Sequence, residues 1–92
     1  MKVPPPRQEL RLRLERFRAL LAREQLSGAL ITDPANVHYL SGFTGDSSAL
    51  LVTQRHRMLL TDFRFVEEGR HSAPGWRIVS EVHSMVVVER YA

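Results

Sequence analysis

The stretch from Asn36 to Asp46 holds the residue types best suited to contact another molecule. It combines two glycines with small hydroxyl residues, an amide and a carboxylate, and short apolar segments flank it on both sides. This composition is typical of a loop that approaches a ligand or a partner closely. The sequence contains no motif that pairs a nucleophile with a base and no phosphate-binding loop. The stretch is therefore a candidate functional surface, but it does not by itself indicate a reaction.

The histidines give no metal-binding pattern. The four are His38, His56, His71 and His83. No two of them have the i, i+4 spacing of a helical ligand pair, and none lies at ligand spacing from a carboxylate. The chain has no cysteine, which excludes disulfides and thiolate metal sites. We therefore predict that this chain holds neither catalytic residues nor metal ligands.

Asp62 and Arg64 form a second candidate site, with two interpretations left open. Asp62 follows an apolar strand and is suited to cap the next helix. It can also orient Arg64, whose planar guanidinium would then offer a fork for a carboxylate, such as the C-terminus of a peptide or an acidic side chain of a neighbouring subunit. Asp46 is equally explained as a turn residue. Core packing explains Phe43 better than Tyr39, because the tyrosine hydroxyl needs a partner.

Length and composition restrict the class of protein. A chain of 92 residues forms one small domain and is too short for a two-domain enzyme. With 43% hydrophobic and 25% charged residues, it is neither disordered nor a membrane protein by composition. No apolar run is long enough to span a bilayer, and the first residues lack the apolar core of a signal peptide. Together with the lack of cysteine, this predicts a cytoplasmic protein.

Positive charge is concentrated at the start of the chain. Residues 1–26 carry seven basic and three acidic side chains, whereas the remainder carries six basic and seven acidic ones. This excess is explained by a solvated outer helix face, or by attraction to an acidic partner. No nucleic-acid motif or aromatic platform accompanies the arginines, so we expect no nucleic-acid partner.

The elements alternate in the order helix, strand, helix, two strands, helix, strand. The expected ranges are residues 8–26, 29–32, a short helix from 34, 49–52, 58–60, 63–72 and 76–80. This order predicts an α/β fold with a mixed sheet flanked by helices. The strand pair 49–52 and 58–60 is expected to be antiparallel.

The spacing of apolar residues and the capping residues place these elements in more detail. An apolar stripe on the first helix is formed by Leu10, Leu14, Phe17 and Leu21, and Ser27-Gly28 is expected to end that helix. The strand 29–32 is predicted to be covered on both faces. Asp33-Pro34 is expected to start the short helix, with Val37 and Leu40 facing the core.

Two further segments carry expectations about packing. In the helix 63–72, Phe63, Val66 and Gly69 are expected to face inward. The loop from Ser41 to Ser48 is expected to be too small and polar to pack as part of the core.

The C-terminal run is apolar and β-branched from Met85 to Val88. An exposed run of this kind would be an association site, so we expect a homodimer. The alternative is a free-standing protein-interaction module that uses the basic first helix or this valine-rich tail.

Two motifs of this chain resemble those of a known family. They are the pattern Asn36-x-x-Tyr39-Leu40-Ser41-Gly42-Phe43-Thr44-Gly45 and the strand ending in Leu59-Leu60-Thr61-Asp62-x-Arg64, preceded by an amphipathic helix and Gly28-Ala29-Leu30-Ile31-Thr32. In their order and separation, these motifs resemble the N-terminal domain of the creatinase, prolidase and aminopeptidase P family. The resemblance runs from about Glu9 to Val79.

The resemblance implies a mixed sheet with helices on its faces, containing a ribonuclease H-like motif. In the family, the catalytic histidines and two divalent metal ions, manganese, cobalt or zinc, lie on a separate C-terminal domain that cleaves an Xaa-Pro bond. The N-terminal domain helps to form dimers and narrows the entrance to the active site. This chain would then be inactive alone, with residues 1–7 as a disordered tail, 8–82 as the domain and 83–92 as the start of a linker to an absent catalytic domain.

Carried over to this sequence, the resemblance marks a set of gating or interface positions. They are Asn36, Tyr39, Gly42, Phe43, Gly45, Asp62 and Arg64, to which we add Asp46. The chain departs from the family pattern at four places: Asp46 replaces a common serine, Ala49 a glycine, Phe63 a small residue and Phe65 a tyrosine. These departures bear on specific substrate contacts and leave the fold expectation unchanged.

Overall fold

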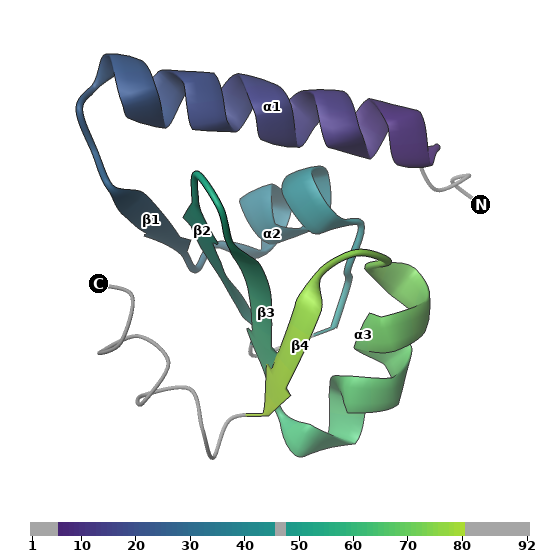
Figure 1. Cartoon of the computed structure of the whole chain (residues 1–92). Helices are drawn as coiled ribbons and strands as arrows, with labels where there is room; N and C mark the ends of the chain where they lie inside the picture. Colours follow the sequence, from purple (N-terminus) through teal and green to yellow (C-terminus); the bar gives the residue numbers. More distant parts are fainter. Residues whose placement is uncertain (1–5, 46–47, 81–92) are drawn as a thin grey trace.

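The computed structural model describes residues 6–45 and 48–80, which form a sheet of four strands with three α-helices (Figure 1). The elements are α1 (Arg7–Arg23), β1 (Gly28–Ile31), α2 (Pro34–Ser41), β2 (Ala49–Thr53), β3 (Arg57–Thr61), the 3₁₀ turn η1 (Phe63–Phe65), α3 (Val66–Ser72) and β4 (Arg77–Ser80). The predicted order of helices and strands is confirmed. No helix in this described part is long and apolar enough to cross a membrane.

The sheet is mixed, with the strand order β1-β2-β3-β4. The pairs β1–β2 and β2–β3 are antiparallel, as predicted for the second pair, while β3–β4 is parallel. The register sets Ile31 opposite Leu50 and Thr61 opposite Ser80. The end of β1, the start of β2, the end of β3 and the end of β4 therefore lie at one end of the sheet. The predicted fold class, a mixed sheet flanked by helices, is confirmed.

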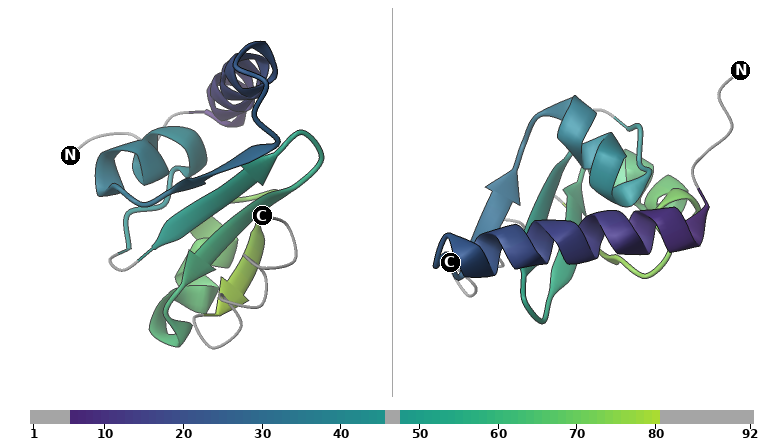
Figure 2. Two further views of the ribbon diagram at one scale, coloured as in Figure 1. Left: turned by 90° about the vertical axis from the view of Figure 1, so that its left-hand side faces the viewer. Right: turned by 90° about the horizontal axis from the view of Figure 1, so that it is seen from above.

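The core has two parts, one on each face of the sheet. The larger cluster draws on α1, α2 and the strands, and its buried members are Leu14, Leu21, Val37, Leu40, Phe43, Leu50, Val52, Leu59, Ala73 and Trp76. Helices α1 and α2 contact each other above this face (Figure 2). Buried Gly69 of α3 lies against the same face, because a Cβ there would be 3.2 Å from Cδ2 of Leu59. The smaller cluster, on the opposite face, contains Leu51, Met58, Leu60 and Val79.

The first helix ends earlier than its sequence predicted. It stops at Arg23, and Gln25 takes the left-handed conformation with a φ of 59°. The Leu26 N–H donates to the Leu21 carbonyl at 2.9 Å and the Gln25 N–H to the Ala22 carbonyl at 3.1 Å. These two bonds form a Schellman motif, with glutamine in the position that glycine usually takes. The expectation that Ser27-Gly28 ends the helix is therefore wrong.

Gly28 belongs instead to β1, where its lack of a side chain serves a close approach. A Cβ on this residue would lie 2.9 Å from the Val52 carbonyl oxygen of the neighbouring strand. The strand is not covered on both faces, since Leu30 is 49% exposed. This prediction failed because β1 is an outer strand of the described sheet, and an apolar run does not reveal which strand lies outside.

Two packing predictions are also corrected. Phe63 is 73% exposed, because the segment begins with a 3₁₀ turn that rotates it away from the core before α3 starts at Val66. The stretch from Ser41 does contribute to the core, since Ser41 is fully buried and Phe43 is 1% exposed. Phe43 is thus a core residue, as its apolar ring suggested, whereas Tyr39 is 47% exposed. Val37 and Leu40 are buried as predicted.

Candidate functional site at one end of the sheet

At the end of β1, Asp33 caps α2 and holds Asn36. The Asp33 carboxylate accepts one hydrogen bond from the Asn36 backbone N–H at 3.0 Å and a second from the Asn36 side-chain amide at 2.9 Å. Pro34 follows at the first helical position, where its missing N–H costs nothing. The bond from the Asn36 amide, followed by the backbone bond, lowers the pKa of Asp33. The sequence predicted a side-chain cap at Asp33 and proline at the first helical position, and both predictions are confirmed.

At the other end of α2, Gly42 turns the chain into the glycine loop. Its φ is 83°, and its N–H donates to the His38 carbonyl at 2.8 Å. This conformation is strained for a residue with a side chain. The buried Ser41 hydroxyl donates to the Val37 carbonyl at 2.6 Å and accepts from the Phe43 N–H at 3.1 Å. Helix, turn and loop are therefore joined by a single hydroxyl.

The Phe43 ring forms the inner wall of the loop at Gly45. A Cβ at Gly45 would overlap Cζ of Phe43, so a side chain there requires the ring to move. The ring is 1% exposed and meets Phe65 edge to face, with centroids 6.3 Å apart, so it has little room to do so. Glycine at this position follows from the close approach of the backbone to a buried ring.

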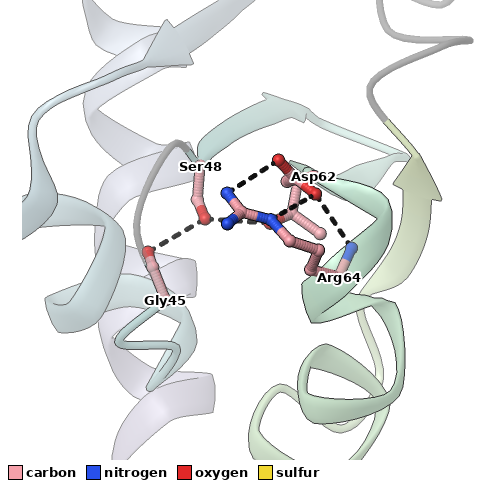
Figure 3. Close-up of polar contacts among 5 residues, drawn as sticks. Gly45, Ser48, Asp62 and Arg64 are labelled. Carbon is pink, nitrogen blue, oxygen red and sulfur yellow. Dashed lines mark hydrogen bonds and ion pairs between the residues drawn. The ribbon is translucent and has the colours of Figure 1, made fainter.

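Two hydroxyls link the loop to the end of β3 (Figure 3). The Ser48 hydroxyl donates to the Gly45 carbonyl at 3.0 Å and lies 3.2 Å from the Thr61 hydroxyl. Because a hydroxyl has one proton, Thr61 is the donor in the second bond when Ser48 donates to Gly45. Thr61 is 1% exposed. A partly buried polar link thus connects the glycine loop with the residue that precedes Asp62.

Asp62 both caps the following turn and orients Arg64. One oxygen of its carboxylate accepts from the Arg64 backbone N–H at 2.9 Å and from Nε at 3.1 Å, and the other accepts from Nη2 at 3.0 Å (Figure 3). The Asp62 side chain is 15% exposed and that of Arg64 is 64% exposed. Hydrogen bonds from the Arg64 side chain, then its backbone, lower the pKa of Asp62. Of the two interpretations left open, the structure has the cap that also orients the arginine.

The predicted site residues therefore divide into two groups. Gly45, Asp62 and Arg64 gather at the sheet end, and Gly42 and Phe43 support them from inside. A hollow of about 120 Å³ joins this loop to the end of β1 through Thr32, Pro34, Val37, Phe43, Thr44, Gly45 and Ser48. Asn36 and Tyr39 line a different hollow, between α1 and α2. Asp46 lies outside the described residues, as does the run from Met85 to Val88.

Ser48 and Thr61 are site residues that sequence reasoning missed. Their contact depends on the β2–β3 register, which sets Ala49 opposite Leu60, and no local pattern reveals it. In residues 6–45 and 48–80, no three histidine, aspartate or glutamate side chains are grouped to hold a metal ion. The chemistry available at this end of the sheet is the recognition of an anionic or hydrogen-bonding group by a fixed guanidinium beside a tightly packed loop.

Comparison with known proteins assigns the family. Residues 13–90 match the model of the creatinase/prolidase N-terminal domain, which is most of the chain. This protein belongs to that family, as the two motifs indicated.

Its relatives include peptidases that are longer than this chain. An uncharacterized peptidase of Bacillus subtilis, YqhT, is 31% identical over 75 residues, which are 82% of this chain and 21% of the peptidase. An Xaa-Pro aminopeptidase from Streptococcus pyogenes is 30% identical with a TM-score of 0.84, over 90% of this chain and 64% of that one. The N-terminal domain of the cytoplasmic peptidase PepQ from Mycobacterium tuberculosis is 38% identical with a TM-score of 0.73, over 76% of this chain and 55% of that one.

Proposed function

We propose that this chain acts as the non-catalytic N-terminal domain of an Xaa-Pro peptidase, and that it contributes there to dimer assembly and substrate gating. The observation that carries the proposal is the exposed guanidinium of Arg64, held by Asp62 at the sheet end beside the glycine loop. Relatives with this fold are described as Xaa-Pro aminopeptidases and an Xaa-Pro dipeptidase. A proline-containing peptide is therefore the substrate class that we propose for the parent enzyme.

The rigid packing at Gly45 and the fixed charge of Arg64 support the proposed gating role. Gly45 is packed against a buried ring, and Arg64 is tied to Asp62 by two side-chain bonds. The glycine loop and Arg64 could narrow the entrance to an active site without closing it, because these residues have little freedom to move. The guanidinium would attract the carboxylate of a short peptide and help to orient it.

The reaction chemistry, in this proposal, belongs to a catalytic domain outside this chain. Two divalent ions, manganese, cobalt or zinc, would be held there and would activate water. The residues described here would bind and orient, and none would act as acid, base or ligand. We further propose a homodimer and a cytoplasmic location. Light scattering that gives the mass of a monomer at millimolar protein concentration would contradict the dimer.

A chimera provides the test. The Xaa-Pro dipeptidase of Bacillus anthracis is 28% identical to this chain with a TM-score of 0.75, and the match covers 86% of this chain and 24% of the dipeptidase. We expect the isolated chain with manganese to leave an alanyl-proline dipeptide intact. Replacing the matching domain of the dipeptidase by this chain should give an active enzyme. Hydrolysis by the isolated chain, or a folded but inactive chimera, would contradict the proposal.

We propose no nucleic-acid partner for this chain. A hollow of about 170 Å³ brings Arg7, Arg11 and Arg57 together beside Trp76. The tryptophan is only 7% exposed, so its ring offers no free face on which a base could stack. We expect a fluorescent single-stranded oligonucleotide to show no binding at physiological salt concentration.

A further inference from the structure

A second, larger hollow lies between α1, β1 and α2. Its volume is about 440 Å³, within the range of roughly 300–1,000 Å³ that ligand pockets occupy. Phe17, Ile31 and Leu40 contribute its more buried apolar lining, and Leu20 and Leu30 its exposed apolar lining. None of these five residues belongs to the group of Gly45, Asp62 and Arg64 at the sheet end.

Exposed apolar side chains are concentrated at this hollow. In the described part of the chain, three of the six exposed large apolar residues line it: Leu20 at 40%, Leu30 at 49% and Tyr39 at 47%. A single exposed leucine is ordinary, but a group of apolar residues around one concave surface indicates a binding site.

The backbone of β1 adds a second feature. This strand is at one end of the strand order and, among the described residues, pairs only with β2. Its outer edge carries N–H and C=O groups that another extended chain can pair with. Gly28–Ile31 contains neither proline nor a charged residue, which are the usual means of blocking such pairing. Leu30 and Ile31 also line the hollow, so a chain added here would lie beside it.

The charge available to a ligand at this hollow is positive. Arg13 is already engaged: it donates to Glu9 at 3.3 Å and to the Tyr39 carbonyl at 3.0 Å, and lies 4.3 Å from the centroid of the Tyr39 ring. Arg16 lies one turn further along α1, is exposed, and forms no ion pair with another described residue. The carboxylate of Asp33 also lines the hollow and accepts both hydrogen bonds from the neutral Asn36, so it keeps its negative charge. The two arginines and one aspartate of the lining therefore leave a net charge of +1. Arg16 is therefore the residue best placed to bind an anion.

We propose that this hollow binds the C-terminal end of an extended peptide that ends in an apolar residue. The peptide backbone pairs with the outer edge of β1, and its apolar side chains pack against Leu20 on the α1 side of the sheet and against Leu30 on the other. Its terminal carboxylate binds the Arg16 guanidinium. This site uses none of Gly45, Asp62 and Arg64, and it stands or falls independently of the proposed function.

The role of the peptide's terminal carboxylate is tested with the full 92-residue chain and a fluorescein-labelled peptide, Ser-Thr-Val-Thr-Leu. The peptide is made with either a free C-terminus or a C-terminal amide. Fluorescence anisotropy should give at least tenfold tighter binding of the free acid, and added salt should weaken that preference. Arg16→Gln should abolish the preference. Arg23→Gln is the matched control, since it removes the same charge from the same helix outside the lining of the hollow.

The apolar part is tested by a second matched pair. Leu30→Asn should weaken binding of the free acid about tenfold, whereas Leu12→Asn, which changes an exposed leucine outside the lining, should leave it unchanged. Circular dichroism confirms that each variant is folded. Equal binding of acid and amide, equal effects of the two arginine variants, or no peptide binding by the folded chain would overturn the proposal. A dimer that Leu30→Asn dissociates, and that the peptide does not compete with, would assign the surface to a second copy of this chain instead.

Discussion

The ends of β1 and β3 use the same device with different partners. In each case an aspartate within two residues of the strand end caps the following helix or turn and binds a side chain two or three residues further on: Asp33 holds Asn36, and Asp62 holds Arg64. The first partner is a neutral amide and the second a cation. Both carboxyl groups have a lowered pKa, with the side-chain hydrogen bond as the largest cause.

The difference shows what each end contributes. At the end of β1, the cap fixes the start of α2 and adds no net charge beyond that of the aspartate. At the end of β3, it also fixes a guanidinium that is 64% exposed, so the positive charge is held at a defined place on the surface. The gating role that we propose needs the second arrangement, whereas the first serves the fold.

The largest effect is expected from Phe43→Ala, which removes the ring inside the loop between the two ends. Phe43 is 1% exposed, so the change should lower the free energy of unfolding by about 3–5 kcal/mol. Phe63→Ala is the control, because that ring is 73% exposed and its loss should change stability by less than about 0.5 kcal/mol. Urea unfolding measures both. Equal destabilisation by the two variants would show that Phe43 does not support the loop.

A smaller effect is expected where the loop meets β3. Thr61→Val keeps the side-chain shape and removes the hydroxyl that lies 3.2 Å from that of Ser48. We expect a loss of about 0.5–1.5 kcal/mol in the free energy of unfolding. A double-mutant cycle with Ser48→Ala isolates the contact. Strictly additive losses would mean that the two hydroxyls do not interact in solution.

The two caps should respond differently to loss of charge. Asp33→Asn retains a good capping residue and a partner that is itself neutral, so little change in stability is expected. Asp62→Asn also retains the cap but loses the ion pair with Arg64, so it should destabilise the fold more. Thermal unfolding of the two variants at low salt makes the comparison, and raising the salt concentration should reduce the difference. The reverse order of stabilities would contradict the account of the two ends.

The smallest effect is a change in titration. A lowered folded pKa means that each aspartate contributes its stabilisation fully above the unfolded pKa of about 3.9, and that this contribution is lost as the pH falls through the folded pKa. Arg64→Gln should raise the pKa of Asp62 toward its ordinary value and leave that of Asp33 unchanged. A carbon-13 NMR titration of the side-chain carboxyl groups measures both. Equal shifts at the two aspartates would show that the guanidinium is not the main cause.

The parts of the fold that follow from local chemistry could be predicted from the sequence. The Asp33-Pro34 start of α2 rests on the conformation of two residues, and the burial of Val37 and Leu40 rests on helical spacing. The family motifs combined these local patterns in order, which is why the fold class and the family followed before any long-range contact was known.

What could not be predicted depends on backbone hydrogen bonds and on neighbours that are distant in the sequence. Gln25 ends α1 in a conformation that favours glycine, because two backbone bonds to the last turn stabilise it there. The exposure of Leu30 depends on β1 being an outer strand of the described sheet, and the contact of Ser48 with Thr61 depends on the β2–β3 register. Composition and periodicity carry none of this information.

The central claim, that the sheet end orients substrate for a catalytic domain elsewhere, is tested most directly in the chimera with the Bacillus anthracis dipeptidase. Arg64→Gln should lower kcat/KM for an alanyl-proline dipeptide about tenfold, chiefly by raising KM, whereas Arg70→Gln should leave it unchanged. Arg70 is a matched control, since it is 62% exposed and ion-paired to Glu67 on α3. Equal kcat/KM values for the two variants in folded chimeras would contradict the claim.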